Sequence, residues 1–312
     1  MVQSVLLQQQ PVTVKPPFPA KYRVMKMPSE EFEYSWLDKN TILVLTRSSN
    51  GNLQFTTIPG RAKYFKLCKA LHEDIQTAIY IPRLLNAGKD LVAVTSGRHY
   101  SVFHYDGNLG PQMGNYHADV CWQRDHIRAI HSFIGTNGHL LSYGLVSLYT
   151  FSTNLSPEIT PIQNSASNPL FVSGMVIDCA LSKQYISVLS RPINTKDLYG
   201  DDESKNRKVW LLNRQLGNLD GPTKRMVLNV PYNVYEGAKF SPDGNRFYLW
   251  STPKGSDYGK MYIGKTSDGS LKQLKLIPRR LRDETLRNIK WKPDSKSISI
   301  TWDGYLYVLP VE

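Results

Sequence analysis

Two stretches near the C-terminus decide the fold: AKFSPDGNRFYLW at residues 238–250 and IKWKPDSKSISITW at residues 289–302. In each, a short apolar strand ends in an aromatic residue, Phe240 or Trp291, and a Pro-Asp turn follows. Proline presets φ at the first corner of such a turn, while Asp and Gly accept the conformations of the next corner. A second strand resumes seven residues after the aromatic residue in both copies. The two stretches therefore predict one repeated β-hairpin.

Weaker copies of this hairpin can be traced upstream. Trp36 and Cys179 occupy the aromatic position in two of them, with a turn and a second strand following. A further hairpin then leads to a third strand. In two copies this hairpin carries Asn50-Gly51 or Asp303-Gly304, dipeptides that suit a tight turn because both of its corner residues need positive φ. A fourth strand usually closes the unit. The units are spaced about 50 residues apart, and they start near residues 36, 79, 131, 179, 240 and 291.

Six units of four strands predict an all-β fold, a six-bladed β-propeller with four-stranded antiparallel blades. We expect residues 1–312 to form this single domain. The last unit ends directly after its third strand, while residues 1–28 hold extended stretches, 11–15 and 21–27, before the first unit. One of these stretches can supply the outer strand of the last blade, which would close the ring and remove open sheet edges.

The repeat resembles that of TolB-like propellers, whose core reads F-S-P-D-G followed by alternating apolar residues, a hairpin and an L-Y-V strand. The matching segments are FSPDGNRFYLW at 240–250, KMYIGKTSDG at 260–269 and WKPDSKSISITWDGYLYVLPVE at 291–312. The resemblance implies a propeller fold that binds proteins, and it implies no catalytic activity. WD-repeat proteins are a second analogue, but their Trp-Asp pair is out of register here, because Trp302-Asp303 falls at a hairpin.

The charge balance points to anionic partners. The chain holds 38 Lys and Arg against 26 Asp and Glu, a net charge of +12, and a field of that sign attracts nucleic acid, an acidic protein face or an anionic membrane. No apolar stretch reaches the length of a transmembrane helix, and the N-terminus does not read as a signal peptide. Three scattered cysteines, Cys68, Cys121 and Cys179, favour a reducing compartment. We therefore expect the protein in the cytoplasm.

The sequence carries no recognisable catalytic motif. There is no nucleophile elbow, H-E-x-x-H, P-loop or G-x-G-x-x-G, so we predict no catalytic residues, no cofactor and no metal. One cluster has residue types that suit zinc, but its spacing matches no zinc module and the residues read as ordinary loop and strand positions. Its members are His117, Cys121, His126, His131 and His139. Cys179 is expected to pack in the core.

The longest insertions indicate where a partner binds. In a propeller, the hairpin between the second and third strands lies on the same face as the connection to the next blade. The insertions fall on these two loop types, at 192–207 and 253–259 for the hairpins and at 110–126, 230–236 and 279–287 for the connections. Loops that vary without disturbing a scaffold are where binding usually resides. We therefore predict that this loop-rich face is the interaction surface.

We accordingly expect a non-enzymatic scaffold for protein–protein interaction, a monomer within a larger complex, whose loop-rich face binds an acidic patch of a partner. Arginine forks suit carboxylates, and a tyrosine can anchor an interface. The predicted partner-binding residues are Arg279, Arg280, Arg282, Arg287, Lys290, Tyr199, Lys205 and Arg207. Two alternatives remain open: a metal-dependent hydrolase or lactonase centred on the channel, and a nucleic-acid-associated protein that uses the basic face.

Overall fold

A computed structural model gives the fold of the chain. It describes residues 18–28, 32–36, 38–47, 49–50, 53–58, 65–66, 83–84, 91–96, 99–104, 121–124, 130–133, 139–143, 148–152, 159–162, 175–182, 184–191, 207–213, 225–231, 233–234, 236–252, 259–276 and 289–312. These ranges form strands almost throughout, with one short 3-10 helix, η1 (Ala20–Tyr22). The prediction of an all-β protein is confirmed.

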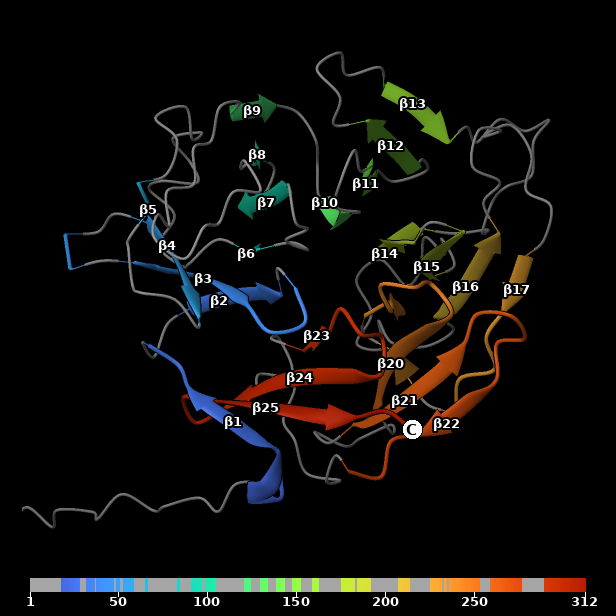
Figure 1. The fold of residues 1–312 in the computed structure, drawn as a ribbon. Coiled ribbons are helices and arrows are strands. Elements are labelled where there is room, and N and C mark those ends of the chain that lie inside the picture. Colours follow the sequence, from blue (N-terminus) through green and yellow to red (C-terminus); the bar gives the residue numbers. More distant parts are fainter. Residues whose placement is uncertain are drawn as a thin grey trace, which may run out of the picture.

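The described strands form antiparallel sheets that succeed one another around the molecule in chain order (Figure 1). Three sheets come from the N-terminal half: β2 (Phe32–Trp36), β3 (Ile42–Arg47), β4 (Leu53–Ile58) and β5 (Phe65–Lys66); then β6 (Arg83–Leu84), β7 (Leu91–Ser96), β8 (His99–His104) and β9 (Cys121–Arg124); then β10 (Ile130–Phe133), β11 (His139–Tyr143), β12 (Leu148–Ser152) and β13 (Ile159–Ile162).

The C-terminal half supplies the other three sheets among the described residues. They are β14 (Met175–Leu181), β15 (Tyr185–Arg191), β16 (Lys208–Asn213) and β17 (Arg225–Val227); then β18 (Asn233–Val234), β19 (Lys239–Phe240), β20 (Arg246–Thr252), β21 (Lys260–Lys265) and β22 (Leu271–Gln273); then β23 (Lys290–Trp291), β24 (Ser297–Trp302), β25 (Tyr305–Pro310) and β1 (Arg23–Lys26). Here β18 and β19 pair with different parts of β20, so together they act as one interrupted innermost strand.

The last sheet draws its strands from both ends of the chain. β1 pairs antiparallel with β25, with Arg23 opposite Tyr307 and Lys26 opposite Tyr305, and the two strands lie side by side in Figure 1. Phe18, which precedes η1, is buried and packs on the Tyr307 ring at 5.0 Å between centroids. β1 thus takes the outermost position of the sheet, which the C-terminal repeat leaves empty.

The two diagnostic turns have the same backbone conformation. Ser241 N donates to Arg246 O at 2.8 Å in one, and Lys292 N donates to Ser297 O at 2.9 Å in the other. Gly244 and Ser295 hold equivalent positions at φ of 74° and 57°, where Gly is the easier residue. Asp303 and Gly304 both have positive φ between β24 and β25, which confirms the hairpin predicted from that dipeptide.

The register corrects one sequence assignment. We placed Cys179 at the aromatic position of its repeat, but Leu181 pairs with Ile186 just as Phe240 pairs with Phe247. The reason is a tighter turn, in which Ser182 N donates to Tyr185 O at 2.8 Å, and the register runs without a break from this turn back to Asp178. Leu181 therefore holds the equivalent position. Cys179 lies two residues earlier in β14 and is fully buried, as its predicted core role requires.

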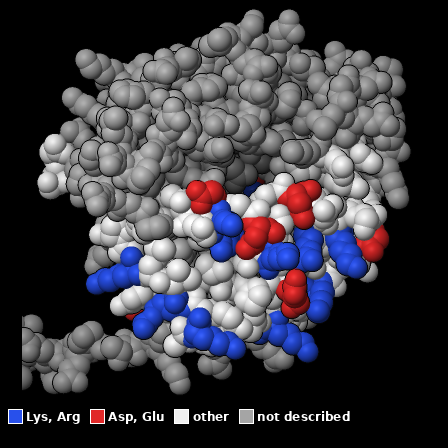
Figure 2. Space-filling view, viewed as in Figure 1, with Lys and Arg blue, Asp and Glu red and all other residues white. Residues whose placement is uncertain are grey.

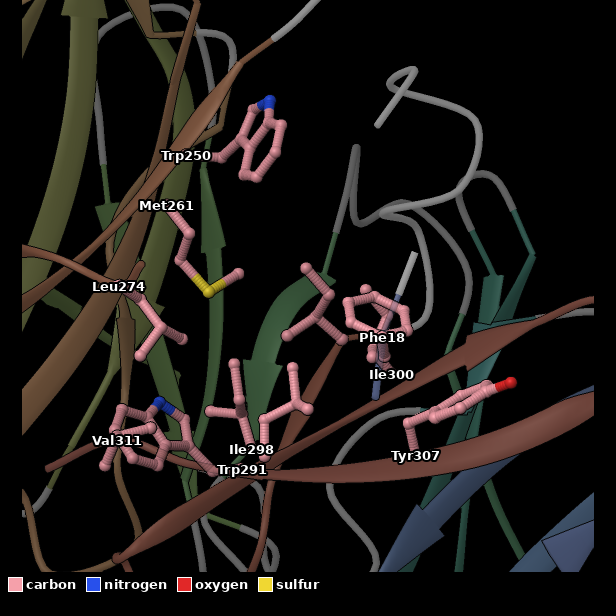
Figure 3. Packing of buried hydrophobic residues seen from close by; sticks show 11 residues of the cluster. Phe18, Trp250, Met261, Leu274, Trp291, Ile298, Ile300, Tyr307 and Val311 are labelled. Atoms are coloured by element: carbon pink, nitrogen blue, oxygen red, sulfur yellow. The ribbon is translucent and has the colours of Figure 1, made fainter. Parts of the chain in front are cut away.

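Apolar clusters join neighbouring sheets. The largest aromatic one fills the space between β20–β22 and β23–β25, with Phe18 reaching into it, and Figure 3 shows Phe18, Ile300 and Tyr307 converging there. A second cluster joins β15 and β16 to β20, and a third joins β2 and β3 to β25. Each aromatic side chain that leaves water in these clusters contributes about 1.5–3 kcal/mol, so packing between neighbouring sheets stabilises the described part.

Candidate protein-interaction face

The strand ends that flank the predicted loops lie together. β15 ends at Arg191 and β16 begins at Lys208, so they flank the insertion 192–207. Arg207, at the end of this insertion, donates from Nη1 to the carbonyl of Val234 at 3.2 Å. Val234 lies in β18, so part of the segment 230–236, which we predicted to be a connection, is a strand that pairs with β20. The end of the hairpin insertion is therefore bonded directly to the innermost strand of the next sheet.

The mouth of the next hairpin is adjacent to this contact. Val234 pairs with Ser251 and Asn233 with Thr252 at the end of β20, directly before the insertion 253–259. The Trp250 indole covers Gly259 so closely that a Cβ there would lie 2.2 Å from Trp250 Nε1. Glycine at 259 is therefore required for the return of the chain into β21.

Two buried hydroxyl groups lie at the end of β20, directly before the insertion 253–259. The hydroxyls of Ser251 and Thr252 are buried, and neither finds a hydrogen-bond partner among the described residues. A buried hydroxyl without a partner costs about 1–3 kcal/mol.

Most of the predicted partner-binding residues lie outside the described ranges: Tyr199, Lys205, Arg279, Arg280, Arg282 and Arg287. Arg207 is half-buried and bonded to Val234 as described above. Lys290 is turned inwards: its ammonium donates to Leu84 O at 3.2 Å and lies 3.6 Å from Glu33 Oε2. Lys290 thereby links β23 to the innermost strands of the first two sheets, a role that its sequence neighbours gave no reason to expect.

We call the contact between the first and last sheets the terminal seam, made by Tyr34 and Trp36 of β2 with Ser299 of β24. Ser299 Oγ is fully buried; it lies 2.8 Å from Tyr34 Oη and accepts from Trp36 Nε1 at 2.8 Å. It also donates to Lys290 O at 3.2 Å. One donor and two acceptor positions exhaust what a hydroxyl offers, so Ser299 is fully used by the seam.

A second contact, the internal seam, joins β14 to the β19 region through Asp178. Its carboxylate accepts from Lys239 Nζ at 2.6 Å, from Gly237 N at 2.7 Å and from Cys179 N at 2.8 Å. The Asp178 and Lys239 side chains are 9% and 15% exposed, so the pair is largely withdrawn from water. A Cβ at residue 237 would lie 3.3 Å from Asp178 Oδ2, so glycine there permits the close approach of the backbone.

Burial sets the protonation of the neutral groups in both seams. It raises the pKa of the Cys179 thiol well above its ordinary value, and the Asp178 charge adds to the rise. Burial likewise raises the pKa of the Tyr34 phenol far above its ordinary value of 10.0, although the hydrogen bond to Ser299 acts against it. Both groups are therefore neutral at physiological pH, and Cys179 lacks the thiolate that a nucleophile needs.

Metal-binding groups are not gathered in the described ranges, where no three His, Cys, Asp or Glu side chains come together to hold an ion. The zinc-like cluster of the sequence is distributed over two sheets: Cys121 lies in β9, the outermost strand of one, and His131 and His139 lie in β10 and β11 of the next. His117 and His126 lie outside the described residues.

Comparison with known proteins places the fold. No family model and no curated protein sequence matches the chain. Among solved structures it is similar to TolB from Acinetobacter baumannii, with 14% identity, a TM-score of 0.50 and coverage of 89% of this chain and 65% of that one. The fold is of the β-propeller type. At this identity the likeness extends to the fold alone, and this propeller spans 65% of the TolB chain.

Two other solved structures are similar to the chain at comparable levels. An oligogalacturonate lyase in complex with manganese has 8% identity and a TM-score of 0.51, with coverage of 93% of this chain and 78% of that one. Hsv2 from Kluyveromyces lactis has 13% identity and a TM-score of 0.49, with coverage of 91% and 74%. No described helix is long and apolar enough to cross a membrane.

Proposed function

We propose that this propeller is a non-enzymatic scaffold of six blades, closed into a ring by β1, which binds an acidic surface of a partner protein through its loop-rich face. The observation that carries the proposal is the hydrogen bond from Arg207 to Val234 O. It joins the end of the insertion 192–207 to β18, which pairs with the end of β20 directly before the insertion 253–259. A rigid ring that presents such loops in fixed relative positions lowers the ordering cost of binding.

The partner's acidity is inferred from charge. The chain carries +12, and the segment 279–292 holds six Lys and Arg against two acidic residues. Acidic residues that the structure describes are largely engaged inside the chain, as Asp178 and Glu33 are with Lys239 and Lys290. The rim of the described part also shows an excess of Lys and Arg (Figure 2), which supports a partner of negative charge.

The experiment is quantitative co-purification from the native source by mass spectrometry, with wild type against R279A/R280A/R282A. We expect the triple variant to lose the acidic protein that wild type enriches. A matched control, K265A/K272A/K275A, removes the same charge from exposed positions of another sheet. Equal recovery of the partner by the triple variant and wild type would rule out binding through the arginine loop.

Closure of the ring has its own test. Deletion of residues 1–28 removes β1 and the buried Phe18, so we expect a large fall in the melting temperature. The matched control is deletion of residues 1–17, which leaves both in place and should melt like the full chain. An unchanged melting temperature after the longer deletion would contradict closure by β1.

The enzyme alternative keeps one supporting observation, the propeller fold shared with a lyase that was solved with manganese. A channel-centred metal hydrolase requires several oxygen or nitrogen ligands aimed at the axis. Elemental analysis of the purified protein separates the two proposals, because a stoichiometric, tightly bound metal would favour the enzyme. We also propose that the protein is cytoplasmic. Few cysteines and a free thiol at Cys179 suit a reducing compartment.

A further inference from the structure

Residues 18–26, which hold η1 and β1, rest on the outer side of the last sheet with little burial, and we call them the N-terminal strap. Phe18, 3% exposed, is the one residue of the strap that is buried. Tyr22 and Met25 are half-buried, and the other strap residues are exposed, with Val24 at 52%. Since burial of apolar surface is the main favourable contribution to folding, the strap is held mainly through Phe18.

The backbone pairing of the strap is short and irregular. β1 pairs with β25 at three positions, and the register shifts between Arg23 and Met25. The Arg23 guanidinium also lies 4.9 Å from the Tyr305 ring, but such a contact contributes little at an exposed site. Few buried side chains and a short run of pairing are typical of segments that open while the rest of a protein stays folded.

The first and last sheets contact each other without the strap. The terminal seam joins them through its hydrogen bonds, and the third apolar cluster packs beside it. Of the strap residues, Met25 alone packs against this cluster, from its edge. Met27, directly after the strap, is buried in the cluster and donates from its backbone N to Gly304 O at 2.7 Å. The contact between the two sheets and the anchor at Met27 therefore remain when the strap leaves.

We propose that the strap opens reversibly as one unit, with Met27 as the pivot, while the sheets stay folded. This inference rests on the proposed closure of the ring by β1. When closed, the strap places Phe18 on the Tyr307 ring at 5.0 Å between centroids (Figure 3) and covers the outer edge of β25. When open, it uncovers both. An uncovered edge strand is a template for pairing with another chain, so the strap determines when the last sheet exposes such an edge.

The test is native-state hydrogen exchange of the full chain, followed by peptide mass spectrometry at urea concentrations below the unfolding transition. We expect the amides of β1 to be protected, yet to exchange at least about 100-fold faster than those of β24, because opening the strap does not require unfolding of the sheets. The rates in β1 should also change little with urea concentration, since a small opening exposes little surface.

Two other results would contradict the proposal, each in its own way. Equal rates and equal urea dependence in β1 and β24 would mean that the strap leaves only when the whole protein unfolds. Closure of the ring by β1 would then stand, and the independent strap would be overturned. Exchange of β1 as fast as in an unstructured peptide would mean that β1 is not docked on β25, and closure by β1 would be overturned together with the strap.

Substitutions separate opening of the strap from a general loss of stability. Phe18→Ala should speed the exchange of β1 by at least about tenfold, because it removes the buried anchor, whereas Phe18→Leu should retain most of the protection. The matched control, Leu249→Ala, removes a fully buried side chain of the second apolar cluster. It should speed the exchange of β20 by at least about tenfold and leave β1 within about twofold of wild type. Equal acceleration of β1 and β20 by Leu249→Ala, or no acceleration of β1 by Phe18→Ala, would overturn the strap.

Discussion

The internal and terminal seams solve the same problem with different chemistry. In the internal seam one carboxylate, Asp178, takes three donors at 2.6–2.8 Å. In the terminal seam a neutral hydroxyl, Ser299, serves Tyr34 and Trp36 at 2.8 Å, and the ion pair beside it, Lys290 with Glu33, is longer at 3.6 Å. The first seam combines a charged carboxylate with the second apolar cluster, and the second seam combines neutral hydrogen bonds with the third cluster.

The difference matches the length of chain that each seam closes. The internal contacts join residues 59 and 61 positions apart, and the terminal contacts join residues 263 and 265 apart. Loop closure costs about 0.6 kcal/mol for each doubling of length, so the terminal seam has about 1 kcal/mol more entropy to offset. It does so with several buried groups, including Tyr34 and Ile42 of the third apolar cluster. The comparison teaches that a long closure needs packing as well as polar bonds.

The largest expected effect is on the internal seam. Asp178→Ala leaves the Lys239 ammonium buried without its partner and two backbone N–H groups without an acceptor, so the free energy of unfolding should fall by about 3–5 kcal/mol. Urea unfolding followed by circular dichroism measures it. Glu33→Gln, the matched change in the terminal seam, should cost at most about 1 kcal/mol because that ion pair is longer. Equal costs would remove the distinction between the seams.

A smaller loss is expected for Ser299→Ala. The substitution leaves the Trp36 N–H and the Tyr34 O–H, both buried, without their acceptor, which should cost roughly 2–3 kcal/mol. The same unfolding measurement applies. Ser297→Ala, on the same strand but half-buried, serves as control and should stay within about 0.5 kcal/mol of wild type. A cost below that for Ser299→Ala would mean that packing alone holds the terminal seam.

Alkaline pH should loosen the terminal seam selectively. Tyr34 has a raised pKa in the folded protein, so above its ordinary value of 10.0 it ionises only when unfolded. The unfolded state then binds fewer protons, and stability falls with rising pH by about 1.4 kcal/mol per unit from this group. Tyr34→Phe should lose that component while other groups titrate unchanged. Parallel pH profiles of melting temperature for wild type and variant would contradict it.

The smallest effect concerns reactivity rather than stability. Cys179 is buried beside Asp178, and its pKa is raised, so the folded protein should protect it from N-ethylmaleimide. We expect labelling at Cys179 to be slowed about 100-fold relative to protein in denaturant, as read by peptide mass spectrometry. In Asp178→Ala the protection should fall together with the stability of the internal seam. Rapid labelling of folded wild type would contradict the burial.

The predicted partner-binding residues differ in whether the neighbouring sequence indicates their contacts. The loop positions could be proposed from insert length and charge, and most of them lie outside the described residues. Lys290 was grouped with them only because basic neighbours precede it. Its ammonium instead reaches Leu84 O, 206 positions away, and no local pattern encodes a contact of that range.

What the sequence by itself determined about this protein was local. Pro-Asp and Asp-Gly turns, together with alternating apolar residues, are enough to define hairpins, because turn conformation depends on a few adjacent residues. The tertiary structure alone decided the register of Cys179 and Leu181, the pairing of Ser299 with Tyr34 and Trp36, and the meeting of Arg23 with Tyr305. The register depends on the length of the turn between the two strands, and the other two contacts depend on which sheets and strands lie side by side, so adjacent residues do not encode them.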